Sequence, residues 1–102
     1  MLHWLTGDEF GSDEALRLNF VQRVVPAGQE LDEALKIAKA IAEQAPLAVV
    51  ATRRNVLKAL EHGPLVAMHD FIAVQHALSN SNDAREGVAS FVEKRPARFT
   101  GR

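Results

Sequence analysis

Chain breakers divide most of this sequence into segments that each carry the apolar spacing of an α-helix. From residue 31 onward, apolar side chains recur at intervals of three and four, which places them on one face of a helix. Pro46, the pair Gly63-Pro64 and the polar run 79–83 interrupt that spacing. Proline and glycine end helices or stand at their first turn. The sequence therefore predicts a mainly all-α fold.

These breakers delimit about five helices, which we expect over residues 12–18, 31–45, 47–62, 65–78 and 83–95. On the two middle helices we expect an inward stripe formed by Val49, Thr52, Val56, Ala59, Leu60, Leu65, Met68, Phe71, Ile72 and Leu78. Residues 2–5 are typical of the end of a helix, with Gly7 as its stop. The β-branched stretch 20–25 predicts one short strand. Because alanine is abundant on the inner faces and buries little area, we infer that the helices need an outside partner.

The last predicted helix has clear start and stop signals. All five residues of the polar run 79–83 are capable N-caps, and Asp83 followed by Glu86 has the spacing of a capping box. Lys94 and Arg95 come at the end, where the helix dipole favours cations, and Pro96 forbids continuation. We expect a structural role for Glu86.

An apolar stripe runs along the same helix, and a glycine interrupts it. The glycine, Gly87, costs about 1 kcal/mol relative to alanine inside a helix, so we interpret it as a place where a neighbouring backbone passes close. The stripe consists of Ala84, Val88, Phe91 and Val92.

Composition excludes several classes of function. The chain has 102 residues, 47% of them hydrophobic, which suits one soluble domain. Its net charge of −1 argues against a nucleic-acid binder, although the basic end, residues 91–102, could meet a phosphate-bearing small molecule. There is no cysteine, which is compatible with the cytoplasm, and no apolar run approaches the ~20 residues that a membrane span needs.

Metal binding and acid–base catalysis find little support in the sequence. His62, His69 and His76 recur every seven residues, whereas metal ligands on one helix favour a spacing of three or four. We therefore expect no shared metal site and interpret these histidines as half-buried polar edges. The acidic residues outside the last helix fall at helix caps or on outer faces, so we expect no catalytic pair.

Five motifs in order resemble the C-terminal part of the enoyl-CoA hydratases and isomerases of the crotonase superfamily. Each motif is weak alone, and the resemblance is strong because the five occur in the right order. They are Leu5-Thr6-Gly7, Val24-Val25-Pro26, Ala45-Pro46-Leu47-Ala48, Asp83-Ala84-Arg85-Glu86-Gly87, and the stretch from Phe91 to Arg95 followed by Pro96-Ala97-Arg98-Phe99.

The resemblance implies that residues 1–102 are a C-terminal helical and oligomerisation domain without the ββα spiral core. In the family, that core supplies the oxyanion-hole N–H groups and the catalytic glutamates. We therefore expect no catalytic residue and no turnover from these residues alone. The intact enzyme would hydrate or isomerise an acyl-CoA thioester in the cytoplasm through an oxyanion-stabilised enolate. It would form a trimer-type homo-oligomer and bind no cofactor tightly.

Phe91 and Lys94 are the candidate ligand-binding residues. The resemblance implies that they contact the adenine and phosphates of coenzyme A, with Arg95 and Arg98 as less specific helpers for phosphate. An aromatic ring can stack on a purine while an ammonium meets a phosphate beside it. The alternative is that Phe91 belongs to the core and Lys94 only matches the helix dipole.

Two other interpretations of the whole chain stay open at this point. One is a free-standing helical module that binds itself or a partner through its alanine-rich faces and has no affinity for coenzyme A. The other is a regulatory fragment that joins full-length homologues as a subunit.

Overall fold

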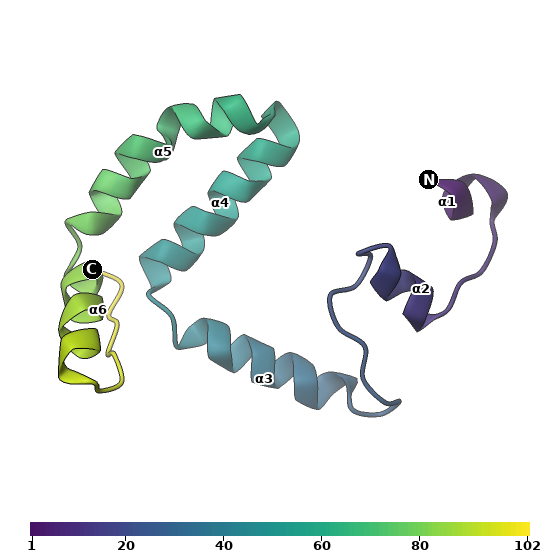
Figure 1. Cartoon of the computed structure of the whole chain (residues 1–102), viewed down its shortest axis with the longest axis horizontal. Helices are drawn as coiled ribbons and strands as arrows, with labels where there is room; N and C mark the ends of the chain where they lie inside the picture. Colours follow the sequence, from purple (N-terminus) through teal and green to yellow (C-terminus); the bar gives the residue numbers. More distant parts are fainter. The chain divides into compact units, whose positions relative to one another are not determined.

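The structure, a computed structural model, describes residues 1–102 and contains six α-helices and no β-strand (Figure 1). This confirms the mainly helical prediction and adds one helix to the expected five. The chain forms two compact units, residues 1–36 and 37–102. The helices are α1 (Leu2–Thr6), α2 (Ser12–Arg17), α3 (Glu30–Ala42), α4 (Pro46–His62), α5 (Pro64–Ser79) and α6 (Asn82–Glu93).

In the first unit, the stop signal at Gly7 is confirmed and the predicted strand is wrong. Gly7 ends α1 in the left-handed conformation, with φ at 74°. Residues 20–25 form no strand, because no second segment pairs with them. The N–H groups of Phe20 and Val21 instead donate to the carbonyl oxygen of Ala15, closing the end of α2. An isolated strand leaves its backbone groups unpaired, so this local closure is the more stable arrangement.

In the second unit, the predicted breaks fall where proline and glycine put them. Pro46 and Pro64 are the first residues of α4 and α5, positions at which a missing N–H costs nothing. Gly63, with φ at 89°, forms the junction. Lys58 on α4 makes an ion pair with Asp70 on α5, so the two helices fold back on each other as a hairpin.

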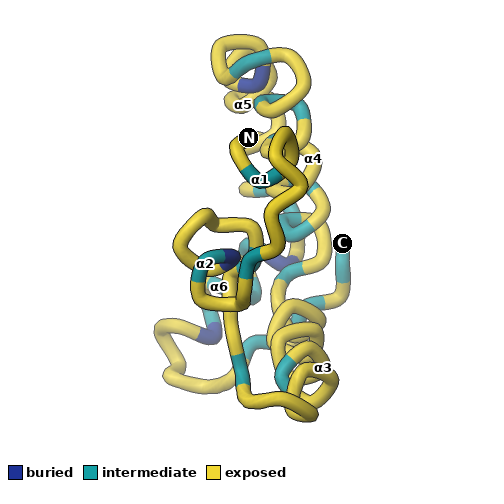
Figure 2. Tube along the Cα trace, turned by 90° about the vertical axis from the view of Figure 1, so that its right-hand side faces the viewer, coloured by how far each residue is buried: buried dark blue, intermediate teal, exposed yellow.

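Most apolar side chains of the chain are uncovered (Figure 2). The only buried hydrophobic residues are Ala15 and Ala67. The predicted inward stripe is wrong for Leu65 and Ile72, which are 81% and 76% exposed, and for Val56, Leu60, Met68 and Phe71. Such a large apolar surface is unusual for an isolated soluble domain, which supports the inferred outside partner.

Two remaining features concern the surface of the helices. No helix is both long enough and apolar enough to cross a membrane. The side chains of His62 and His69 are 59% and 88% exposed, so the interpretation of the histidines as half-buried edges is wrong.

Candidate functional site

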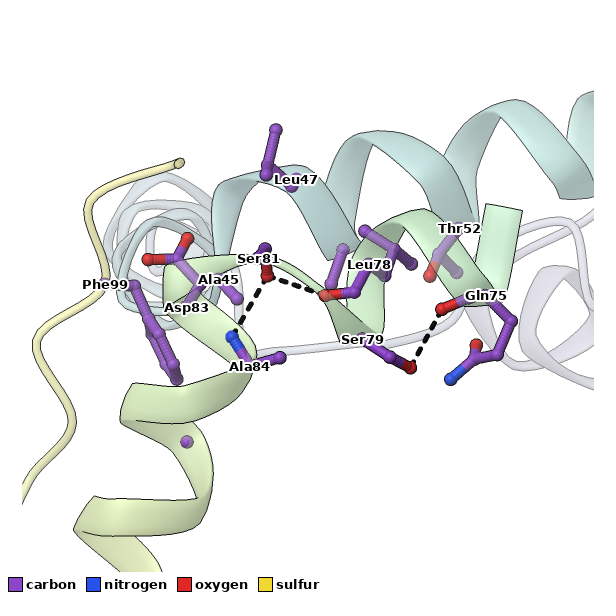
Figure 3. Close-up of a pocket in the computed structure, with 12 residues that line it drawn as sticks. Ala45, Leu47, Thr52, Gln75, Leu78, Ser79, Ser81, Asp83, Ala84 and Phe99 are labelled. Carbon is purple, nitrogen blue, oxygen red and sulfur yellow. Dashed lines mark hydrogen bonds between the residues drawn. The ribbon is translucent and has the colours of Figure 1, made fainter. Parts of the chain in front are cut away.

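The start of α6 is capped by Ser81, one of the capable N-caps in the run 79–83, whereas the capping box predicted for Asp83 and Glu86 is wrong. The hydroxyl oxygen of Ser81 accepts the N–H of Ala84 at 3.1 Å and donates to the carbonyl oxygen of Leu78 at 2.7 Å (Figure 3). Serine is as good an N-cap as aspartate, and here it lies three residues before the N–H that it binds. Asp83 and Glu86 are therefore free to bind another segment.

That segment is the C-terminal tail, residues 95–102, which folds back beside α6. The carboxylate of Asp83, which is only 4% exposed, accepts the N–H of Thr100 at 2.7 Å and that of Gly101 at 2.8 Å. In return, the carbonyl oxygen of Arg102 accepts the N–H groups of Asn82 and Asp83 at 2.7 and 3.2 Å. The first turn of α6 and the end of the tail thus satisfy each other's backbone groups.

Glu86 holds the beginning of the tail. Its two carboxylate oxygens accept from the guanidinium of Arg95 at 2.6 and 2.9 Å, and one of them also accepts the backbone N–H of Arg98 at 2.7 Å. The Arg95 hydrogen bonds, followed by the Arg98 N–H, lower the pKa of Glu86 to about 2. Its predicted structural role is confirmed, but the carboxylate anchors the tail and does not cap the helix.

The depressed pKa of Glu86 predicts that the tail loosens in acid. A carboxyl group with a lower pKa in the folded chain stabilises that state above its ordinary pKa of 4.5. This stabilisation is lost as the pH falls from there through the folded pKa of about 2. Thermal unfolding followed from pH 6 to pH 2 should show the loss, and Glu86→Gln should reduce its size over that range. A titration midpoint near 4.5 for the Glu86 carboxyl carbon, measured by NMR, would contradict this.

Phe99 lies against the one glycine inside α6. A Cβ on Gly87 would lie 3.8 Å from the Phe99 ring, which is an ordinary van der Waals distance, so the predicted close approach of a neighbouring backbone is wrong and the structure has room for a larger residue there. A Cβ on Gly101, whose φ is 76°, would lie 3.6 Å from the Pro46 side chain. The tail therefore touches the start of α4. Beside Phe99 is a cavity of about 390 Å3 between the start of α4, the end of α5 and α6 (Figure 3).

The other face of α6 carries the apolar stripe, and it is open. Phe91 is 85% exposed, and Val88 and Val92 are 68% and 72% exposed. The alternative that Phe91 belongs to the core of this chain is therefore wrong. An aromatic ring with this exposure is available to stack on a flat ligand.

Lys94 ends α6 in a backbone conformation that lysine seldom adopts. The helix stops at Glu93, so the prediction that it continues through Arg95 is wrong. Lys94 is left-handed, with φ at 51°, and the N–H of Arg95 donates to the carbonyl oxygen of Ser90 at 3.1 Å. Glycine usually occupies this position because it has no Cβ to strain the backbone.

Two arginines of the tail, Arg95 and Arg98, differ in how available they are to a ligand. The guanidinium of Arg95 is bound by both Glu86 and Glu93, so its proposed help with phosphate is not supported. The guanidinium of Arg98 forms no ion pair, and with Glu86, Arg95 and Pro96 it lines a cavity of about 430 Å3. No cluster of three or more potential metal ligands is present. The site can therefore offer an aromatic face and two cations to an anionic ligand.

Comparison with known proteins gives one consistent family. Residues 1–102 match the sequence model of the Enoyl-CoA hydratase/isomerase family. A carnitinyl-CoA dehydratase of Escherichia coli K12 is 32% identical over 96% of this chain and 39% of its own length. An enoyl-CoA hydratase of Mycobacterium tuberculosis is 35% identical over 96% and 37%.

A solved structure described as a probable enoyl-CoA hydratase/isomerase from Mycobacterium abscessus superimposes with a TM-score of 0.90. It is 42% identical over 96% of this chain and 38% of its own length. The chain thus spans well under half the length of the relatives that it matches.

Proposed function

Because the chain belongs to the enoyl-CoA hydratase/isomerase family, we propose that residues 1–102 are its C-terminal helical domain, with roles in coenzyme A contact and oligomerisation. The order of the motifs supports this position, since the Glu86-Gly87 and Phe91–Arg95 motifs resemble the end of the family's sequences. The intact enzyme, in the cytoplasm, would hydrate or isomerise an acyl-CoA thioester through an oxyanion-stabilised enolate. The catalytic residues would lie outside residues 1–102.

Contact with coenzyme A is supported by the exposure and backbone of two residues one helical turn apart. Phe91 presents an open ring, which could stack on the adenine. Lys94 is held in a strained conformation, and its ammonium could meet a phosphate. The exposed Phe91 ring is the observation that carries this proposal, because it leaves the residue without a role in the core.

A role in oligomerisation is supported by α5. This helix is apolar nearly all round: Leu65, Val66, Met68, Phe71 and Ile72 are each at least 45% exposed. A helix that is apolar on every face is stable in water only when it is covered on every face. Within the chain α4 covers one side, so the others would be buried by a further protein surface.

Calorimetric titration with coenzyme A tests the ligand contact. We expect Phe91→Ala and Lys94→Gly each to weaken binding by roughly tenfold or more, since base–aromatic stacking and charge-assisted hydrogen bonds are each worth about 1–3 kcal/mol. Lys94→Gly should at the same time raise the melting temperature, because glycine relieves the left-handed strain. Lost affinity in a more stable protein cannot be attributed to unfolding.

The matched control is Val92→Ala, which trims the neighbouring exposed apolar side chain and should leave affinity unchanged. Equal binding by Phe91→Ala and the unaltered chain would contradict the assignment. Absence of heat with the unaltered chain would favour the self-associating module without affinity for coenzyme A.

A further inference from the structure

We propose that Glu86 is a positioning residue for Lys94: its carboxylate fixes the backbone that follows Lys94 and so restricts the directions open to the ammonium group. The inference rests on the proposed contact between Lys94 and coenzyme A, and it assigns Glu86 a part in that contact without touching the ligand.

The carboxylate of Glu86 binds the segment after Lys94 at two points, one at each end of a turn. Glu86 binds the guanidinium of Arg95, the next residue, and the backbone N–H of Arg98, four residues after Lys94. The Glu86 side chain is 21% exposed, so these bonds are partly shielded from water. The turn is therefore closed by a single acidic group.

The helix fixes the same backbone from the other side. The N–H of Lys94 donates to the carbonyl oxygen of Phe91, and that of Arg95 donates to the carbonyl oxygen of Ser90. Lys94 thus lies between two anchors, and its own ammonium is engaged by neither Glu86 nor Glu93, both of which bind Arg95. A long side chain on a fixed backbone loses less conformational entropy when it binds than one on a mobile tail.

Glu86 could affect coenzyme A binding by positioning Lys94 or by its negative charge, and these two roles predict opposite changes in affinity when the carboxylate is removed. Glu86 is an anion close to a site proposed to bind phosphate, so its charge alone weakens that binding. If Glu86 acted through charge alone, Glu86→Gln would bind coenzyme A more tightly. If it holds the turn, Glu86→Gln breaks the bidentate pair and weakens binding although the site becomes more positive.

The test is a titration of the unaltered chain, Glu86→Gln and Glu93→Gln with coenzyme A, together with amide hydrogen exchange. We expect Glu86→Gln to bind about three- to tenfold more weakly, since the loosened backbone that follows Lys94 must then be ordered on binding. Glutamine keeps one carbonyl acceptor, so the Arg98 amide should lose part of its protection, while those of Thr100 and Gly101, which bind Asp83, keep theirs. Glu93→Gln is the matched control: it removes an equal charge that also contacts Arg95, but it leaves the Arg98 anchor in place, so affinity should stay equal or rise.

Three results would overturn the inference. Equal or tighter binding by Glu86→Gln would do so while leaving the proposed function intact. Loss of protection at Thr100 and Gly101 together with Arg98 would show that Glu86 supports the whole tail and has no local role at Lys94. Absence of binding by the unaltered chain would refute the proposed coenzyme A contact itself, and the unaltered titration alone reveals that case.

Discussion

The double substitution Leu65→Glu and Ile72→Glu is expected to convert an associating chain into a monomer. Both side chains lie on α5 and are more than 75% exposed, so they have no packing within the chain to lose. Glutamate is a good helix former, and at position 65 it lies in the first turn, where the helix dipole favours an acid. The substitutions should therefore leave α5 helical while removing the apolar contact that we propose holds copies together.

Sedimentation velocity measures this change as the loss of every species heavier than one chain. The matched control is Arg53→Ala with Arg54→Ala, which changes the net charge by the same amount on the exposed face of α4 without altering apolar surface. We expect this control to associate like the unaltered chain. A monomeric unaltered chain, or a control that dissociates equally, would contradict a role for α5 in oligomerisation.

The largest loss of stability is expected from Asp83→Ala. This change removes the buried acceptor of two backbone N–H groups, those of Thr100 and Gly101. A buried group left without its partner costs about 1–3 kcal/mol, and release of the tail into water recovers part of that cost. We therefore expect α6 to lose about 2–3 kcal/mol of local stability, which is a factor of roughly 30 to 150 in amide protection.

Hydrogen exchange at the amides of α6 is the measurement, and two variants complete it. Asp83→Asn keeps one carbonyl acceptor and should lose less than Asp83→Ala. Asp70→Asn removes an exposed carboxylate on α5 that pairs with Lys58 on α4, so protection in α6 should not change. The prediction fails if Asp83→Ala exchanges as slowly as the unaltered chain.

Local signals predicted the helices of this chain well. Pro46 and Gly63-Pro64 act through their own backbone restrictions, so the starts of α4 and α5 could be predicted to within one residue. Periodicity also located α3 and α6, although which face of each helix is covered depends on the other elements of the fold. The strand predicted for residues 20–25 failed for the same reason, because a strand needs a distant partner.

The candidate site was predictable only in part. Phe91 and Lys94 could be named from motif and spacing, but the exposure of the ring and the left-handed backbone could not. The tail was missed because Asp83 and Glu86 bind residues 9 to 18 positions away, beyond the reach of capping rules. The only signal in the sequence for this contact was the pair of carboxylates, Asp83 and Glu86, which lie one helical turn apart on α6 and are followed by a tail that contains Pro96.

The hydrogen bonds that join α6 and the tail also bear on the order in which parts of the chain fold. Every one of these bonds joins residues within the stretch 82–102. Short loops close in well under a microsecond and a helix of this length forms on a similar timescale. This end of the chain can therefore acquire its native shape early, from nearby contacts alone, whereas in the proposed oligomer the apolar sides of α5 would be covered only by a slower encounter with another surface.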